Sequence, residues 1–182
     1  MSAELALAEP AIVILQQGKL LSVADRTSVS VTLETGHSAG RLWKAFTDPA
    51  EYEQWLYPMD LPAEVGAPVE YRSGGGHVQQ GKVLEWQEGR KVVTTWTEVG
   101  EPSLKDPDTD TVVTFLIEPG TDGGASFTFR HEGITKATKY AAGWLAHWEM
   151  LEGYLAGTPV AFMDSYSRWL PRYEPVFGPF RE

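Results

Sequence analysis

The sequence predicts an α+β domain in which an antiparallel sheet curves around one long helix. Three observations support this prediction. Five runs with strand character follow one another between residues 69 and 131, separated by turn-forming residues. One further strand and a short helical stretch precede these runs, and a long helix follows them. Strands in succession, with helices grouped at their ends, are typical of a sheet that is covered on one face and solvated on the other.

The first elements are indicated by alternation and by capping residues. Thr27–Thr35 alternates Val and Leu with Ser and Thr, which is the pattern of a half-buried strand. Ser38 is the expected N-cap of a helix that runs through Thr47 and buries its Leu, Trp and Phe side chains. Asp48-Pro49 ends this helix and begins a second one, expected over Ala50–Leu56.

The five expected strands have turn chemistry between them. Three consecutive glycines, a Glu-Gly pair, a loop rich in Pro and Asp, and a Gly-containing turn separate them in that order. Alternate side chains of a strand share a face. In the run 111–118, Val113, Phe115 and Ile117 compete with Val112 and Leu116 for the inner face, and we expect the first set to face inward because it contains Phe. The expected strands are Val69–Arg72, Val78–Trp86, Lys91–Val99, Thr111–Glu118 and Ala125–His131.

A long helix is expected near Thr138–Ala156, with Gly157 as its C-terminal cap and Pro159 just beyond. At the helical advance of ~100° per residue, large aromatic residues and one histidine form a stripe roughly 120° wide. Polar-tipped aromatic side chains suit the wall of a partly hydrated cavity. Ordinary large core residues are the alternative interpretation. The stripe consists of Tyr140, Trp144, His147, Trp148, Leu151, Tyr154 and Leu155.

Composition narrows the class of protein. The 182 residues are enough for one domain with a substantial core. The absence of Cys excludes disulfides, thiolate metal sites and cysteine nucleophiles. A formal net charge of -10 argues against nucleic acid as a partner. No basic N-terminal cluster and no apolar run of ~20 residues is present, so neither a signal peptide nor a membrane span is expected. We therefore expect a cytoplasmic globular protein.

The two ends are expected to lie outside the domain of residues 27–157. Residues 1–26 form an N-terminal extension, whose apolar stretch Ala11–Leu21 fits an edge strand or a short docking helix equally well. Residues 158–182 form an aromatic C-terminal extension. This tail is expected to pack on the domain or on the second subunit of a homodimer, because exposed aromatic residues favour aggregation. The small residues that offer a docking surface on the long helix are Ala142, Ala146, Gly153 and Ala156.

The histidines are the main candidates for chemistry, and no catalytic site can be assembled around them. Of the four, only His131 and His147 are expected to face the interior. Glu132 alternates to the opposite face from His131, and Glu149 lies roughly 160° around the helix from His147. No carboxylate therefore completes a metal site or a general-base pair. We expect no catalytic residue, no metal and no cofactor, and a hydrogen-bonding role for the interior histidines.

Several motifs occur in an order that resembles a known family. The run Arg-Leu-Trp-Lys-Ala-Phe-Thr-Asp-Pro, residues 41–49, is followed by Trp55 and by four shorter motifs. The chain resembles the helix-grip domains of the START/SRPBCC superfamily, in the branch related to the activator of the heat-shock chaperone ATPase. The resemblance implies a curved antiparallel sheet that grips the C-terminal helix, with an elongated apolar cavity between them. The shorter motifs are Gly81–Glu85, Val92–Trp96, Phe127–His131 with Gly133, and Gly143-Trp144.

That superfamily includes lipid carriers, hormone receptors, cyclases and co-chaperones, so the resemblance does not imply one activity. We expect non-catalytic binding of a hydrophobic or aromatic small molecule between sheet and helix. A co-chaperone module that binds a chaperone is the alternative, although the residues before Thr27 leave no room for the separate N-terminal domain of the family's activators. A cyclase- or hydrolase-like enzyme is a third interpretation.

The expected cavity follows from strand alternation combined with the helical stripe. A polar tip on several of its aromatic residues would orient a ligand. The competing expectation is that these large rings fill the space themselves and leave no cavity. The expected ligand-binding residues are Tyr71, Trp96, Phe115, Phe129, His131, Trp144, His147 and Trp148.

Overall fold

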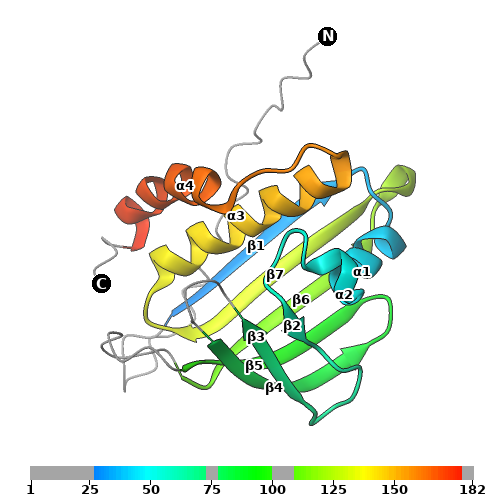
Figure 1. Cartoon of the computed structure of the whole chain (residues 1–182). Coiled ribbons are helices and arrows are strands. Elements are labelled where there is room, and N and C mark those ends of the chain that lie inside the picture. Colours follow the sequence, from blue (N-terminus) through cyan, green and yellow to red (C-terminus); the bar gives the residue numbers. More distant parts are fainter. Residues whose placement is uncertain (1–26, 73–77, 100–108, 178–182) are drawn as a thin grey trace.

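The computed structural model describes residues 27–72, 78–99 and 109–177 of the chain. In this part of the chain, seven strands form one antiparallel sheet in the order β1-β7-β6-β5-β4-β3-β2. The sheet curves around the long helix α3, and the short helices α1 and α2 lie together near one end of it (Figure 1). This arrangement confirms the predicted α+β helix-grip fold.

The boundaries agree closely with the prediction except for the second helix; a two-residue strand, a 3-10 turn and a helix in the C-terminal tail were not predicted. The strands are β1 (Thr27–Thr35), β2 (Met59–Asp60), β3 (Pro68–Arg72), β4 (Val78–Gln87), β5 (Lys91–Val99), β6 (Thr111–Pro119) and β7 (Ala125–Ile134). The helices are α1 (Ala39–Thr47), α2 (Pro49–Tyr52), the 3-10 turn η2 (Thr121–Gly123), α3 (Ala137–Ala156) and α4 (Phe162–Phe177).

The junction of α1 and α2 differs from the prediction. Ser38 caps α1 as expected, since its Oγ accepts a hydrogen bond from the Arg41 N–H. Helix α2 ends at Tyr52 instead of Leu56. The chain turns inward there, and the buried Trp55 donates from Nε1 to the Ala45 carbonyl at 2.9 Å. Strand β2 follows this turn. It has only two residues, which are too few to show a periodic pattern in the sequence.

Strands β1, β7 and β6 pair along most of their length, and this pairing places their inward-facing side chains side by side. Leu33 of β1 is opposite Phe127 of β7, and Phe129 of β7 is opposite Phe115 of β6. All three phenylalanines are buried on the concave face. This is the inner face on which the sequence analysis placed them.

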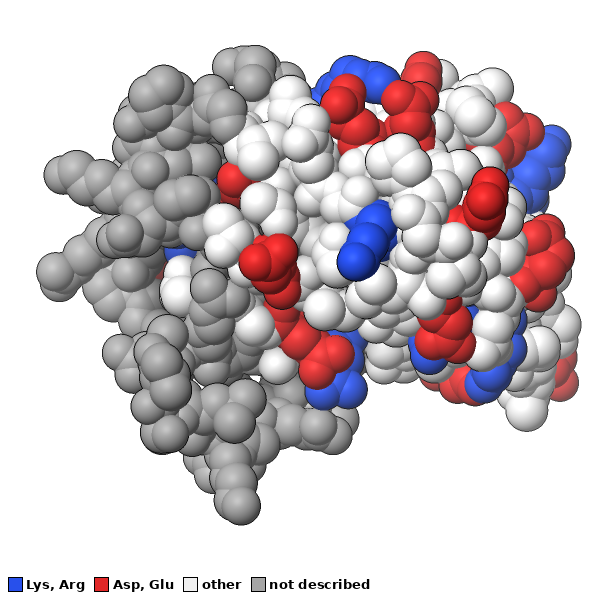
Figure 2. All heavy atoms as spheres, turned by 90° about the horizontal axis from the view of Figure 1, so that it is seen from below, with Lys and Arg blue, Asp and Glu red and all other residues white. Residues whose placement is uncertain are grey.

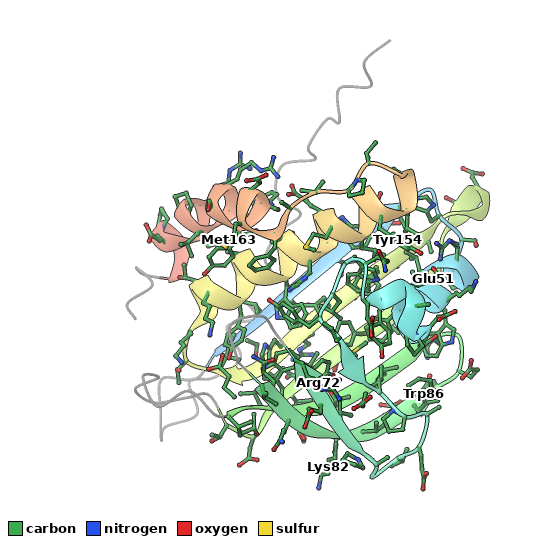
Figure 3. The ribbon with its side chains drawn as sticks, in the orientation of Figure 1. Glu51, Arg72, Lys82, Trp86, Tyr154 and Met163 are labelled. Carbon is green, nitrogen blue, oxygen red and sulfur yellow. The ribbon has the colours of Figure 1, made fainter. Side chains whose placement is uncertain are left out.

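Helix α3 is covered on two sides. Its aromatic stripe faces the sheet, where Tyr140, Trp144, His147 and Leu151 are buried. Gly157 ends the helix with a φ of 72°, the left-handed conformation expected of a glycine cap. Figure 3 shows side chains filling the space between α3 and the sheet.

Helix α4 lies along the side of α3 that faces away from the sheet (Figure 1). Trp169 and Tyr173 are buried in this contact, while Met163, near the start of α4, is 61% exposed (Figure 3). Ser165 and Arg168 both donate hydrogen bonds to the Glu149 carboxylate of α3. These contacts hold the C-terminal segment on its own chain.

The small residues of α3 explain how the tail approaches so closely. Ala142 and Ala146 are fully buried. A Cβ at Gly153 would lie 2.6 Å from the Thr158 carbonyl oxygen, so only glycine lets the connecting segment cross the helix here. One expectation about this surface is wrong in detail, since Ala156 is exposed, and Phe162 of the aromatic tail is only half-buried. The side chain of Phe177, residues 1–26 and His77 lie outside the described residues.

Charged groups are dispersed on the surface. The face in Figure 2 shows Asp and Glu interspersed with Lys and Arg, several of them adjacent, without one continuous basic patch. At the junction of α1, α2 and α3, Arg41 donates to Glu51 and its guanidinium lies 5.7 Å above the Tyr154 ring. Among the described helices, none has the length and hydropathy needed to cross a membrane.

Candidate site between the sheet and helix α3

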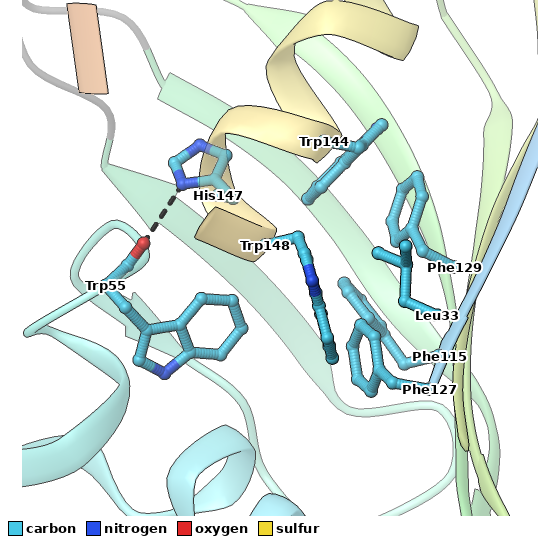
Figure 4. Close-up of a pocket in the computed structure, with 8 residues that line it drawn as sticks. All are labelled: Leu33, Trp55, Phe115, Phe127, Phe129, Trp144, His147 and Trp148. Atoms are coloured by element: carbon cyan, nitrogen blue, oxygen red, sulfur yellow. Dashed lines mark hydrogen bonds between the residues drawn. The ribbon is translucent and has the colours of Figure 1, made fainter. Parts of the chain in front are cut away.

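A cavity of about 10 Å³ lies between the concave face of the sheet and α3. Its walls are almost entirely apolar. This volume holds about one water molecule, so the rings fill most of the space, as the competing expectation proposed. A larger ligand therefore requires one of the wall side chains to move. The lining residues, shown in Figure 4, are Leu33, Trp55, Phe115, Phe127, Phe129, Trp144, His147 and Trp148.

Three separate parts of the chain bring these residues together. Strand pairing places the side chains from β1, β6 and β7 on one inner surface. Residues at positions i, i+3 and i+4 of a helix share a face, so Trp144, His147 and Trp148 of α3 point to the same side. The inward turn after α2 supplies Trp55.

The wall is held by ring packing, and Trp148 is its least constrained member. Trp144 is buried and packs on Phe129 with ring centroids 3.7 Å apart. Trp148 is half-buried and stacks on Phe127 at 5.4 Å with 24° between the planes. No hydrogen bond joins its indole to another residue that the structure describes. An outward movement of Trp148 therefore costs ring contacts but breaks no hydrogen bond.

His147 has a defined tautomer and is neutral at physiological pH. Its Nδ1 lies 3.1 Å from the Trp55 carbonyl oxygen (Figure 4), and because a carbonyl only accepts, Nδ1 carries the proton. Burial lowers the pKa of His147 to about 4, although the bond to Trp55 opposes this shift. The rings of Tyr57 and Phe162 pack on it at 4.7 and 4.9 Å. These contacts make His147 a fixed part of the wall.

The predicted residues divide into two groups. Phe115, Phe129 and the three residues from α3 line the cavity. Tyr71, Trp96 and His131 do not line it; they form a neighbouring aromatic cluster, in which Trp96 lies 4.4 Å from Tyr71 and 5.9 Å from His131. The reason is distance along the strand, because each step of two residues advances about 6.6 Å. Tyr71, Trp96 and His131 share the inner face but lie further along it.

Three lining residues are absent from the predicted set. Phe127 and Leu33 follow the same alternation as residues that were selected, so the pattern contained the signal for both. Trp55 carries no such signal, because its position depends on the turn that shortens α2.

His131 is held from both sides in a buried chain of hydrogen bonds. Thr111 donates to the Trp96 carbonyl at 2.7 Å, so its Oγ1 accepts the proton of His131 Nε2 at 2.8 Å. His131 Nδ1 then accepts from Trp144 Nε1 at 3.4 Å. Burial lowers the pKa of His131 to about 3. Both ring nitrogens are thus occupied, and the described residues contain no group of three His, Asp or Glu that would hold a metal.

Comparisons with known proteins agree with this geometry. The family model for "Activator of Hsp90 ATPase homolog 1-like protein" matches residues 37–156. A comparison with curated proteins found no match.

Solved structures share the fold over most of the chain. CalU16 from Micromonospora echinospora is 15% identical, with a TM-score of 0.66 over 87% of this chain and 93% of that one. The BPP1335 protein of Bordetella parapertussis is 20% identical, with a TM-score of 0.60 over 92% and 94%. MLL2253 from Mesorhizobium loti is 24% identical, with a TM-score of 0.52 over 80% and 97%. At these identities the likeness establishes the fold alone.

Proposed function

The chain belongs to the family of Activator of Hsp90 ATPase homolog 1-like proteins, and we propose that it is a non-catalytic module that binds a hydrophobic, aromatic small molecule between the sheet and α3. The observation that carries the proposal is the stacked pair of Phe127 and Trp148 beside an apolar cavity. Phe127 is buried on the sheet face, and Trp148 on helix α3 is half-exposed.

A flat ligand enters by separating these two rings. Trp148 moves outward, and the ligand takes its place against Phe127 while the indole covers the ligand's other face. The original stack contributes about 0.5–1.5 kcal/mol beyond its buried area, and two new stacking faces replace it. Aromatic walls supply apolar contact area at little cost in conformational entropy, which favours a rigid ring system over a flexible chain.

The state of the two interior histidines supports a non-catalytic role. A general base needs a free nitrogen within reach of the substrate and a pKa near the working pH. Both nitrogens of His131 are bonded within the protein, so it fails the first requirement. His147 donates from Nδ1 to a backbone carbonyl and fails the second. Burial lowers the pKa of each to about 4 or below. Neither arrangement is suited to proton transfer near neutral pH.

The family match itself favours a second candidate, a co-chaperone that stimulates a chaperone ATPase. Family membership and fold fit a ligand-binding or a co-chaperone-type module. The ATPase rate of purified Hsp90 with and without an excess of this protein separates the two. The ligand-binding proposal expects no stimulation, whereas a several-fold rise that the Trp148→Ala variant retains favours the co-chaperone function.

The direct test is titration of the protein with 2-ethylnaphthalene by isothermal calorimetry. We expect saturable one-to-one binding, which Trp148→Ala weakens about tenfold because one stacking face is lost. Trp86→Ala is the matched control, since Trp86 is half-buried on β4, away from the cavity (Figure 3). Native mass spectrometry of the protein purified without denaturation provides a second readout, a retained apolar compound. Absence of both a retained compound and saturable binding would refute the proposal.

A further inference from the structure

The interior of the fold is divided into an apolar end and a polar end. The cavity occupies the apolar end. The other end lies against the first turns of α3 and contains most of the buried polar side chains in the described residues. They are Gln79, Thr94, Glu98, Thr111, His131 and Thr138.

Hydrogen bonds join several side chains of the polar end into pairs. Tyr71 OH and Thr94 Oγ1 lie 3.1 Å apart. Glu98 accepts from Lys139 at 2.7 Å and from Lys136 at 3.3 Å. Burial raises the pKa of this carboxyl, but the two lysines outweigh burial and hold its pKa below the usual range. In the described residues of this end, the Glu98 carboxylate is therefore paired with two lysines of the protein itself.

The indole N–H of Trp96 is an exception. Trp96 is 4% exposed, and its Nε1 has no hydrogen-bond partner within the described part of the chain. An indole nitrogen only donates, and leaving a buried donor unpaired costs free energy that most native structures avoid. The Trp96 ring lies next to the cavity wall, because its centroid is 5.6 Å from that of Trp144.

We infer that the ligand is an aromatic ring system carrying a neutral hydrogen-bond acceptor at one end, such as a ketone or quinone carbonyl, which accepts from Trp96 Nε1. This inference rests on the proposed function and names the chemical class of its ligand. The ligand's rings lie in the apolar end of the interior, and the polar end orients the ligand's carbonyl group.

The surroundings of Trp96 select a neutral acceptor over a charged one. Among the described residues, its ring neighbours are Tyr71, His131 and Trp144, and none of these three supplies a positive charge. An unpaired carboxylate placed among them would bear the desolvation cost of a buried ion. A carbonyl accepts the same hydrogen bond without that cost.

The span between the two ends favours an elongated ligand. Val92 of β5 pairs with Phe115 of the cavity wall, and Trp96 follows four residues later along the same strand. At about 3.3 Å per residue this separation is about 13 Å. A fused ring system that lies in the cavity at the level of Phe115 extends a terminal acyl group toward Trp96, past Trp144.

The test compares two ligands of nearly equal shape, 2-acetylnaphthalene and 2-ethylnaphthalene, by calorimetry. The wild type is expected to prefer the acetyl compound about tenfold. Trp96→Phe keeps an aromatic ring at this position and removes the donor, so the preference should fall to about one while the ethyl compound binds as before. Trp86→Phe, away from the cavity, is the matched control and should keep the preference.

Two spectroscopic readouts report the hydrogen bond itself. The carbonyl stretch of bound ¹³C-labelled 2-acetylnaphthalene should lie at lower frequency in the wild type than in Trp96→Phe. The second readout uses only the wild-type protein, so it does not depend on whether a variant folds. In a ¹⁵N-labelled sample, the signal of the Trp96 indole N–H should move further downfield with the acetyl than with the ethyl compound. Equal shifts, or a preference that Trp96→Phe leaves intact, would overturn the inference while the proposed function stands. Failure of both compounds to bind would refute both this inference and the proposed function.

Discussion

The two buried histidines make the stability of this fold depend on pH. Burial lowers the pKa of His147 to about 4 and that of His131 to about 3, whereas a histidine in the unfolded chain titrates near ~6.5. The unfolded state therefore binds more protons than the folded state as pH falls below ~6.5. The free energy of unfolding is therefore highest above that pH, and it decreases progressively as pH falls toward the pKa values of the folded state.

The size of the effect follows from the same values. Each histidine that stays neutral in the folded state costs about 1.4 kcal/mol of stability per pH unit below ~6.5. Between about pH 6.5 and pH 4.5 the two together remove roughly 5 kcal/mol. Domains of this size are usually stable by only about 5–15 kcal/mol, so the loss should be easily measured before most carboxylates protonate.

Urea unfolding followed by tryptophan fluorescence at several pH values between about 7.5 and 4.5 measures this loss. His147→Asn is the informative variant, because the asparagine amide can replace the Nδ1 proton donated to Trp55 but does not titrate. We expect it to reduce the pH dependence by about half between pH 6 and 4.5. A wild type whose unfolding free energy is flat over the whole range would refute the assignment of both histidines as buried and neutral.

Two further predictions concern the attachment of the tail to α3. Gly153→Ala should destabilise the fold, because its Cβ would lie 2.6 Å from the Thr158 carbonyl oxygen, whereas Gly143→Ala, which meets nothing within 4 Å, should be neutral or stabilise by up to about 1 kcal/mol. Thermal melts of the two variants of the same helix provide the comparison, and equal melting temperatures would contradict the close crossing. Deleting residues 158–182 should expose apolar area worth several kcal/mol at ~25 cal/mol per Å² and cause aggregation in light scattering. A truncated protein that stays monomeric with an unchanged melting temperature would show that Trp169 contributes little.

The predictable part of the fold is the part that periodicity determines. Alternation in β6 and β7 identified Phe115 and Phe129 as inward-facing, and the helical stripe identified Trp144 as facing the sheet. Gly157 was identifiable as a cap because a left-handed residue is needed where a helix ends. Each of these depends on the local pattern of one element.

The remaining features depend on contacts between elements. Trp55 reaches the cavity only because α2 ends early and the chain turns toward Ala45. The division of the interior into two ends depends on how far each strand extends along the helix, which separates Trp96 and His131 from the lining. The volume of about 10 Å³ depends on how closely the rings pack, and no pattern in the sequence encodes that quantity.

The most direct test of the central claim is to locate a bound apolar ring among the seven tryptophan side chains of the chain. Each indole N–H gives its own signal in a ¹⁵N-labelled sample titrated with 2-ethylnaphthalene. The account predicts saturable shifts for the tryptophans of the cavity wall, which are Trp55, Trp144 and Trp148. It predicts little change for those outside the wall on α1, β4 and α4, which are Trp43, Trp86 and Trp169. No saturable shift, or shifts confined to this second group, would contradict binding between the sheet and α3.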